Sequence, residues 1–136
     1  MAPRTYENQR IRVTFDAARC IHSGMCLRGS PTVFDTNAKP WINVDGAEAA
    51  AIAATIRECP SGALRYESDI VDAEVADDPT TIEVRPNGPL FVRGNVTLTR
   101  PGGESTEELR AALCRCGASE NKPFCDNSHR KVGFRA

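Results

Sequence analysis

Three cysteines and a histidine, Cys114, Cys116, Cys125 and His129, lie within sixteen residues near the end of the 136-residue chain. Thiolate sulfur and imidazole nitrogen are common protein ligands of zinc and iron. Cys114 and Cys116 would point the same way on an extended segment, because side chains alternate along a strand. Cys125 and His129 are four residues apart, which on a helix would place them on one face. The spacing therefore predicts two convergent pairs that form one four-ligand site.

The spacing leaves the kind of metal open. A set of three cysteines and one histidine is a known tetrahedral zinc site, but the single residue between Cys114 and Cys116 is a tighter gap than zinc sites usually have. A structural zinc and an iron–sulfur cluster both fit these four residues. Unrelated buried cysteines beside a surface histidine are a third interpretation, which the close clustering disfavours.

A second group of cysteines, Cys20, Cys26 and Cys59, lies in the first half of the chain, and a proline follows Cys59. Bacterial ferredoxins place ligands as C-x2-C-x2-C and take another from a Cys-Pro step. Ser23 stands at the middle position of this pattern, so three thiolates remain. They would hold a 3Fe-4S cluster, or a 4Fe-4S cluster with His22 as the best candidate for its fourth ligand. Three buried core cysteines are the alternative.

Residues 1–67 predict a small α/β module around the second group. After a polar lead-in, the alternating RIRVTF favours a strand, CIHSGMC a loop, and PTVFD and WINV two short strands. An alanine-rich helix is expected over about 47–58, with Asp45 as its N-cap and Pro60 beyond its end. ALRYE completes the module as a strand.

Residues 68–79 are predicted to form an acidic linker, since the stretch 67–79 holds six acidic side chains and no basic one. Residues 80–136 predict a β-rich module, with breaks at 87–89, Gly94 and 101–103. A last short helix, capped by Asp126, would follow. The predicted fold class is therefore α+β, a small α/β unit followed by a β-rich unit.

Composition narrows the setting in which these cysteines would work. The N-terminus has no apolar signal-peptide core, and the longest apolar run is far shorter than the ~20 residues of a membrane span. We therefore expect no membrane partner and a reducing cytoplasm, where clustered cysteines bind metal or do redox chemistry more often than they form disulfides. The net charge of −1 and the lack of a basic stripe speak against a nucleic-acid partner.

The C-terminal segment resembles the CDGSH iron–sulfur family. Its signature C-x-C-x2-[ST]-x3-P-x-C-D-G-x-H is matched by Cys114, Cys116, Ser119, Pro123, Cys125, Asp126 and His129. Asn127 stands where the family has glycine, and we expect the turn to survive because asparagine tolerates the left-handed conformation. The resemblance covers about residues 80–136. It implies an acid-labile 2Fe-2S cluster on Cys114, Cys116, Cys125 and His129 beside a small β-sheet, and it hints at a homodimer.

The first module resembles another family. RCIHSGMCLRGSPTVFD, KPWINVD and ECPSGALRY, within about residues 10–67, are similar to the divergent single-cluster ferredoxin domain of bacteria. They are also similar to the three-cysteine ferredoxins that feed cytochrome P450s. The resemblance implies a ferredoxin-like unit with a cluster on Cys20, Cys26 and Cys59.

The two resemblances predict an electron carrier that shuttles single electrons between a reductase and an oxidase or P450-like acceptor. Its two ligand sets would give two different potentials. The alternative is a storage, transfer or redox- and pH-sensing protein. It would release its 2Fe-2S cluster to apo iron–sulfur proteins when His129 is protonated or the redox state shifts. A zinc-stapled interaction module is a third class. We expect no enzyme with its own substrate, since the sequence offers no nucleophile–base pair and no phosphate-binding loop.

Overall fold

The computed structural model describes residues 2–136 and divides them into two compact units. The first unit contains the chain up to Ala17, His22–Cys59 and Ala63–Glu74. The second contains Ala18–Ile21, Pro60–Gly62 and Val75–Ala136. Two short stretches from the first half of the chain therefore belong to the second unit, and one of them carries Cys20. No helix among residues 2–136 is long and apolar enough to cross a bilayer.

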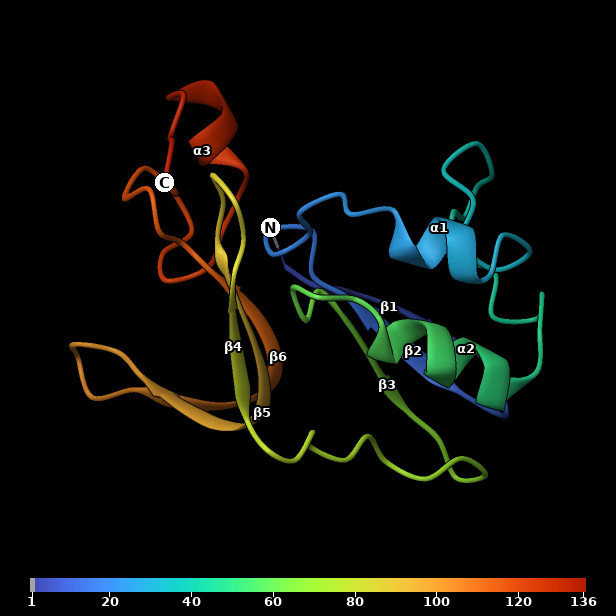
Figure 1. Cartoon of the computed structure of the whole chain (residues 1–136). Helices are drawn as coiled ribbons and strands as arrows, with labels where there is room; N and C mark the ends of the chain where they lie inside the picture. The colour runs from blue at the N-terminus through green and yellow to red at the C-terminus, as the bar shows by residue number, and fades with distance from the viewer. Residues whose placement is uncertain (1) are drawn as a thin grey trace. The chain divides into compact units, whose positions relative to one another are not determined.

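The first unit is a three-stranded antiparallel sheet with two helices (Figure 1). The strands are β1 (Arg4–Glu7), β2 (Arg12–Phe15) and β3 (Leu64–Glu67), in the order β1-β2-β3. The helices are α1 (Met25–Gly29) and α2 (Ala49–Arg57), and α2 packs against β3. Ile52 and Ile56 lie four residues apart on α2 and are fully buried, so one face of this helix completes the core.

Several expectations for the first unit were wrong. The polar lead-in forms β1, because Tyr6 pairs with Val13 of β2. The segments PTVFD and WINV form only one isolated bridge, Phe34 with Ile42, instead of two strands. The segment CIHSGMC is not a loop throughout, because α1 begins within it at Met25.

The predicted N-cap of α2 was also wrong. The helix begins at Ala49, and Glu48 occupies the N-cap position without a side-chain capping hydrogen bond. The carboxylate of Asp45 instead accepts a hydrogen bond from the side-chain amide of Asn8 at 2.9 Å. This bond uses the Asp45 side chain in a turn that precedes the helix.

The second unit is built on another antiparallel sheet, with β4 (Thr81–Val84), β5 (Leu90–Thr99) and β6 (Ser105–Leu113) in that order. The short helix α3 (Ser128–Lys131) follows it, and the chain from β6 to α3 runs from orange to red in Figure 1. Gly94 does not break the strand as expected, because β5 continues through it with a shift of register between Arg93 and Val96. Gly94 has a φ of 145°, so glycine suits this bulge.

A buried arginine from the stretch Ala18–Ile21 lies in the core of the second unit. The Arg19 guanidinium lies 2.9 Å from the carboxylate of Glu108, and both side chains are at least nine-tenths buried. The same nitrogen donates to the carbonyl of Ser61 at 2.8 Å and to that of Arg110 at 3.2 Å. Its planar face lies 4.0 Å from the ring centre of Phe124. Arg19 therefore ties both short stretches to β6.

Candidate metal centre

The end of β6 delivers the first two candidate ligands of the second unit. Cys114 follows β6 directly, and the chain returns beside it through an isolated bridge between Leu113 and Phe124. The amide of Cys114 donates to the Pro123 carbonyl at 2.8 Å, and the amide of Cys125 donates to the Ala112 carbonyl at 2.8 Å. This antiparallel return brings Cys125 alongside the segment that carries Cys114 and Cys116.

The four side chains form two close pairs. The sulfurs of Cys114 and Cys116 are 3.9 Å apart, and the sulfur of Cys125 lies 3.6 Å from Nδ1 of His129. Cys125 and His129 do not share a helix as expected, because α3 begins only at Ser128, but the turn before it still brings them together. Within residues 2–136, no three His, Cys, Asp or Glu side chains are close enough to share one metal ion.

Backbone amides point at the sulfurs of this site. The amide of Ala118 donates to Cys116 and that of Asn127 to Cys125, each at 3.4 Å. Burial acts to raise the pKa of Cys114, but hydrogen bonds from the backbone of Ser119 and Gly117 outweigh it, so this pKa is lowered. A lowered pKa favours the thiolate, which is the form that binds metal.

Cys125 behaves in the opposite way. Burial raises its pKa above the ordinary value, and the nearby Cys114, Asp126 and Cys116 raise it further. Without a metal, a buried thiolate beside other negative groups is unfavourable. A thiol that coordinates a positive metal is instead deprotonated outright, because the metal charge stabilises the thiolate. The donor set at this position therefore fits a cationic metal group.

His129 has the protonation state that a ligand needs. Burial, helped by the charge of Arg130, lowers the pKa of His129 below its ordinary value, so the ring is neutral at pH 7. Only a neutral imidazole can offer its lone pair to a metal. Since Nδ1 faces Cys125, this nitrogen is the one placed to act as the ligand.

The side chain of Ser119 serves the turn. It donates to the Phe124 carbonyl at 2.6 Å and accepts from the Asn121 amide at 3.0 Å. The backbone amide of Ser119, and not its hydroxyl, helps to lower the pKa of Cys114.

Asp126 supports the start of α3, although Asn127 rather than Asp126 occupies the N-cap position. The carboxylate of Asp126 accepts from the amides of Ser128 and Glu120, each at 3.0 Å. Hydrogen bonds from Ser128 and Glu120 lower the pKa of Asp126 to about 2. It therefore remains charged and keeps these bonds at neutral pH.

Sequence reasoning missed what Asn127 and Asn121 do. Asn127 has a φ of 69°, so the turn survives in the left-handed conformation as expected. Its side-chain amide also donates to the Ile21 carbonyl at 2.8 Å, and that of Asn121 donates to the Ala18 carbonyl at 3.0 Å. The replacement of the family's glycine at position 127 was the signal that could have revealed the first of these bonds.

Arg115, between the first two cysteines, is a further residue that the spacing did not single out. Its guanidinium donates to the carbonyls of Gly88 at 2.9 Å and Arg85 at 2.8 Å. It thereby holds the turn between β4 and β5 beside the ligand segment.

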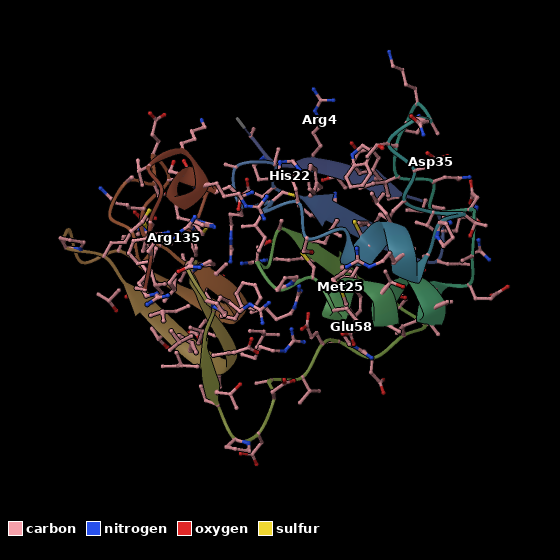
Figure 2. The ribbon with its side chains drawn as sticks, turned by 45° about the horizontal axis from the view of Figure 1, so that its top comes forward. Arg4, His22, Met25, Asp35, Glu58 and Arg135 are labelled. Carbon is pink, nitrogen blue, oxygen red and sulfur yellow. The ribbon has the colours of Figure 1, made fainter. Side chains whose placement is uncertain are left out.

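The cysteines of the first half lie on different elements. Cys26 is on α1 and Cys59 lies just beyond α2, both in the first unit, whereas Cys20 belongs to the second unit. Cys59 is buried, and Cys20 and Cys26 are half-buried. The loop that leads into α1 contains His22, and Met25 is the first residue of the helix (Figure 2).

That loop has an unusual backbone. His22 and Gly24 both have positive φ, 57° and 76°. Left-handed residues curl a loop so that successive N–H groups face one side, which is a feature of many iron–sulfur sites. The backbone and the thiol donors are therefore compatible with a cluster in this part of the chain.

Two family models match the sequence. One, described as a divergent 4Fe-4S mono-cluster, covers residues 6–69, and the other, described as an iron-binding zinc finger of CDGSH type, covers residues 87–130. The first range contains Cys20, Cys26 and Cys59, and the second contains Cys114, Cys116, Cys125 and His129.

Two relatives from Escherichia coli, of strain K12 and of O157:H7, are both named "Uncharacterized protein YjdI". Each is 44% identical to this chain over 63 residues, which is 46% of this chain and 83% of the relative. The two family models confirm both resemblances that the sequence motifs predicted.

Proposed function

Because this chain belongs to the iron–sulfur proteins and fuses a divergent 4Fe-4S mono-cluster domain to a CDGSH-type domain, we propose that it is a two-cluster electron carrier. It would accept single electrons from a reductase and pass them to an acceptor protein. The observation that carries the proposal is that the four C-terminal ligands form two close pairs, with separations of 3.9 Å and 3.6 Å.

The C-terminal site is proposed to hold a 2Fe-2S cluster on Cys114, Cys116, Cys125 and His129. Such a cluster has two irons with two protein ligands each, and the two observed pairs match this number. When bound, the cluster supplies one-electron redox chemistry. The neutral imidazole carries less negative charge than a thiolate, and the amides at Cys116 and Cys125 stabilise added electron density. Both features raise the potential relative to an all-cysteine site.

The N-terminal site is proposed to hold one cluster on Cys20, Cys26 and Cys59. The family match and the left-handed loop at His22 and Gly24 support it. The cluster would be 3Fe-4S, or 4Fe-4S with His22 as its fourth ligand. Because its ligand set differs from the C-terminal one, the two sites would have different potentials.

The proposed partners are proteins. A flavin-containing reductase would supply electrons, and an oxidase or P450-like protein would accept them. In this role the chain is a carrier and not an enzyme with its own substrate. A reducing cytoplasm is the proposed compartment, since free thiols are available there for cluster assembly.

Electron paramagnetic resonance on anaerobically purified protein, before and after dithionite, tests the proposal. A signal in the oxidised sample would identify a 3Fe-4S centre, because oxidised 2Fe-2S and 4Fe-4S centres are silent. Signals that appear only on reduction would identify 4Fe-4S beside 2Fe-2S. A Cys59→Ser variant should lose the signal of the N-terminal cluster and keep that of the C-terminal 2Fe-2S cluster. The comparison assigns each signal to its site.

Function as a carrier then requires that a reductase reduce the clusters and an acceptor reoxidise them, with iron content unchanged. Net transfer of the 2Fe-2S cluster to an apo-protein would instead support storage or delivery. Colourless protein that contains zinc and no sulfide would contradict both.

A further inference from the structure

We infer that Asn127 is the bridge through which an electron passes between the N-terminal and C-terminal clusters. The inference rests on the proposed function, because it requires a cluster at each site. Asn127 would then have a role beyond the turn, and it is the position at which this chain departs from the CDGSH signature.

Asn127 is hydrogen-bonded in two directions. Its backbone amide donates to the sulfur of Cys125 at 3.4 Å, and its side-chain amide donates to the carbonyl of Ile21 at 2.8 Å. Ile21 is joined to Cys20 by a peptide bond. One residue therefore connects a proposed ligand of the C-terminal cluster to the neighbour of a proposed ligand of the N-terminal cluster.

Packing supports the same route. Ile21 is 8% exposed and Cys125 is 3% exposed, and both belong to one buried cluster with Ala112, against which Phe91 packs. Electron tunnelling weakens less steeply through covalent and hydrogen bonds than through open space. A bonded route through a buried contact is therefore a favourable path.

A second asparagine holds the same stretch without touching a ligand sulfur. The side chain of Asn121 donates to the Ala18 carbonyl at 3.0 Å. Asn121 therefore provides a matched control, since its bond tethers Ala18–Ile21 in the same way but ends on no sulfur.

The backbone explains why asparagine can take this position. Residue 127 has a φ of 69°, a conformation open to glycine and, among other residues, most readily to asparagine and aspartate. Glycine would keep the turn and the amide that points at Cys125, but it would have no donor for Ile21.

The proposed step moves one electron and nothing else. The cluster that gives the electron is oxidised by one unit and the other is reduced by one unit, with no bond formed and no proton moved.

The test compares wild type with Asn127→Gly and Asn121→Ala as full-length, cluster-loaded proteins. Flash reduction of one cluster, followed by optical detection of its reoxidation, gives the rate of transfer between the clusters. Redox titration followed by electron paramagnetic resonance gives both potentials and the magnetic interaction between the reduced centres. We expect Asn127→Gly to slow the transfer several-fold and weaken the interaction with both potentials nearly unchanged, whereas Asn121→Ala should match wild type.

An unchanged rate in Asn127→Gly would overturn the bridge and leave the carrier function standing. Equal slowing in both variants would also overturn it, because the effect would then come from tethering alone. If Asn127→Gly loses a cluster, Asn127→Asp tests the same point, since it keeps the left-handed turn and removes the amide donor. Wild-type clusters that no reductase can reduce would instead contradict the proposed function itself.

Discussion

Replacing Arg19 by methionine should strongly destabilise the second unit. The change removes the guanidinium that lies 2.9 Å from Glu108 and that donates to the carbonyls of Ser61 and Arg110. The Glu108 side chain is 3% exposed and would lose its ion pair with Arg19. Removing one partner of a buried ion pair costs about 3–5 kcal/mol, because the other charge stays buried. That is a large part of the ~5–15 kcal/mol that stabilises an ordinary domain.

Urea unfolding of the cluster-loaded protein measures this loss. With a urea dependence of ~2 kcal/mol per molar, a loss of about 3–5 kcal/mol should lower the unfolding midpoint by roughly 1.5–2.5 M. The midpoint would be followed by circular dichroism and by the visible absorbance of the clusters. A double variant, Arg19→Met with Glu108→Leu, is the control, because replacing both charges by apolar groups should recover much of the loss. A shift below ~0.5 M, or a double variant less stable than the single one, would refute the reasoning.

Four further predictions concern single substitutions. His129→Cys should keep the C-terminal cluster and lower its potential in a redox titration, because thiolate replaces neutral imidazole; an equal or higher potential would contradict the ligand assignment. If wild type shows the oxidised 3Fe-4S signal, Ser23→Cys should abolish it by supplying the fourth thiolate, while Ser23→Ala keeps it. Gly62→Ala should cost more than ~1 kcal/mol in urea unfolding, since its φ is 74° and the new Cβ would lie 2.3 Å from the Arg110 carbonyl oxygen; unchanged stability would disprove this strain. Asp126→Asn should lower the melting temperature at pH 7, and the difference from wild type should shrink as pH falls from ~4 to 2, because a depressed pKa of about 2 stabilises only while the carboxylate is charged; a gap independent of pH would argue against this.

Periodicity and turn residues predicted most of the regular structure. RIRVTF and ALRYE form β2 and β3, and the inward face of α2 carries Ile52 and Ile56. Local pattern failed where long-range pairing decides the outcome. The strand β1 exists because β2 offers it hydrogen bonds, and its own sequence reads as a polar tail. The prediction of Asp45 as a cap failed because its carboxylate accepts a hydrogen bond from Asn8, 37 residues away.

The candidate site was predictable as a set of residues and less so as a geometry. The spacing identified the two pairs, but it placed Cys125 on a helix that begins only at Ser128. Arg19 and Arg115 carried no signal, since their partners lie far away along the chain and an arginine in a sequence reads as a surface residue. The bond between Asn127 and the Ile21 carbonyl spans 106 residues, a distance over which one sequence reveals no contact.

The membership of Ala18–Ile21 in the second unit has a consequence for synthesis on the ribosome. Arg19 is translated 91 residues before Arg110, to whose carbonyl it donates. At ~5–20 residues per second, roughly 5 to 20 seconds separate the two. During this interval the nascent chain must keep a cationic side chain in water that will later be buried. The core of the second unit can therefore form only late in translation, when β6 has been made and can pack against the early stretch Ala18–Ile21.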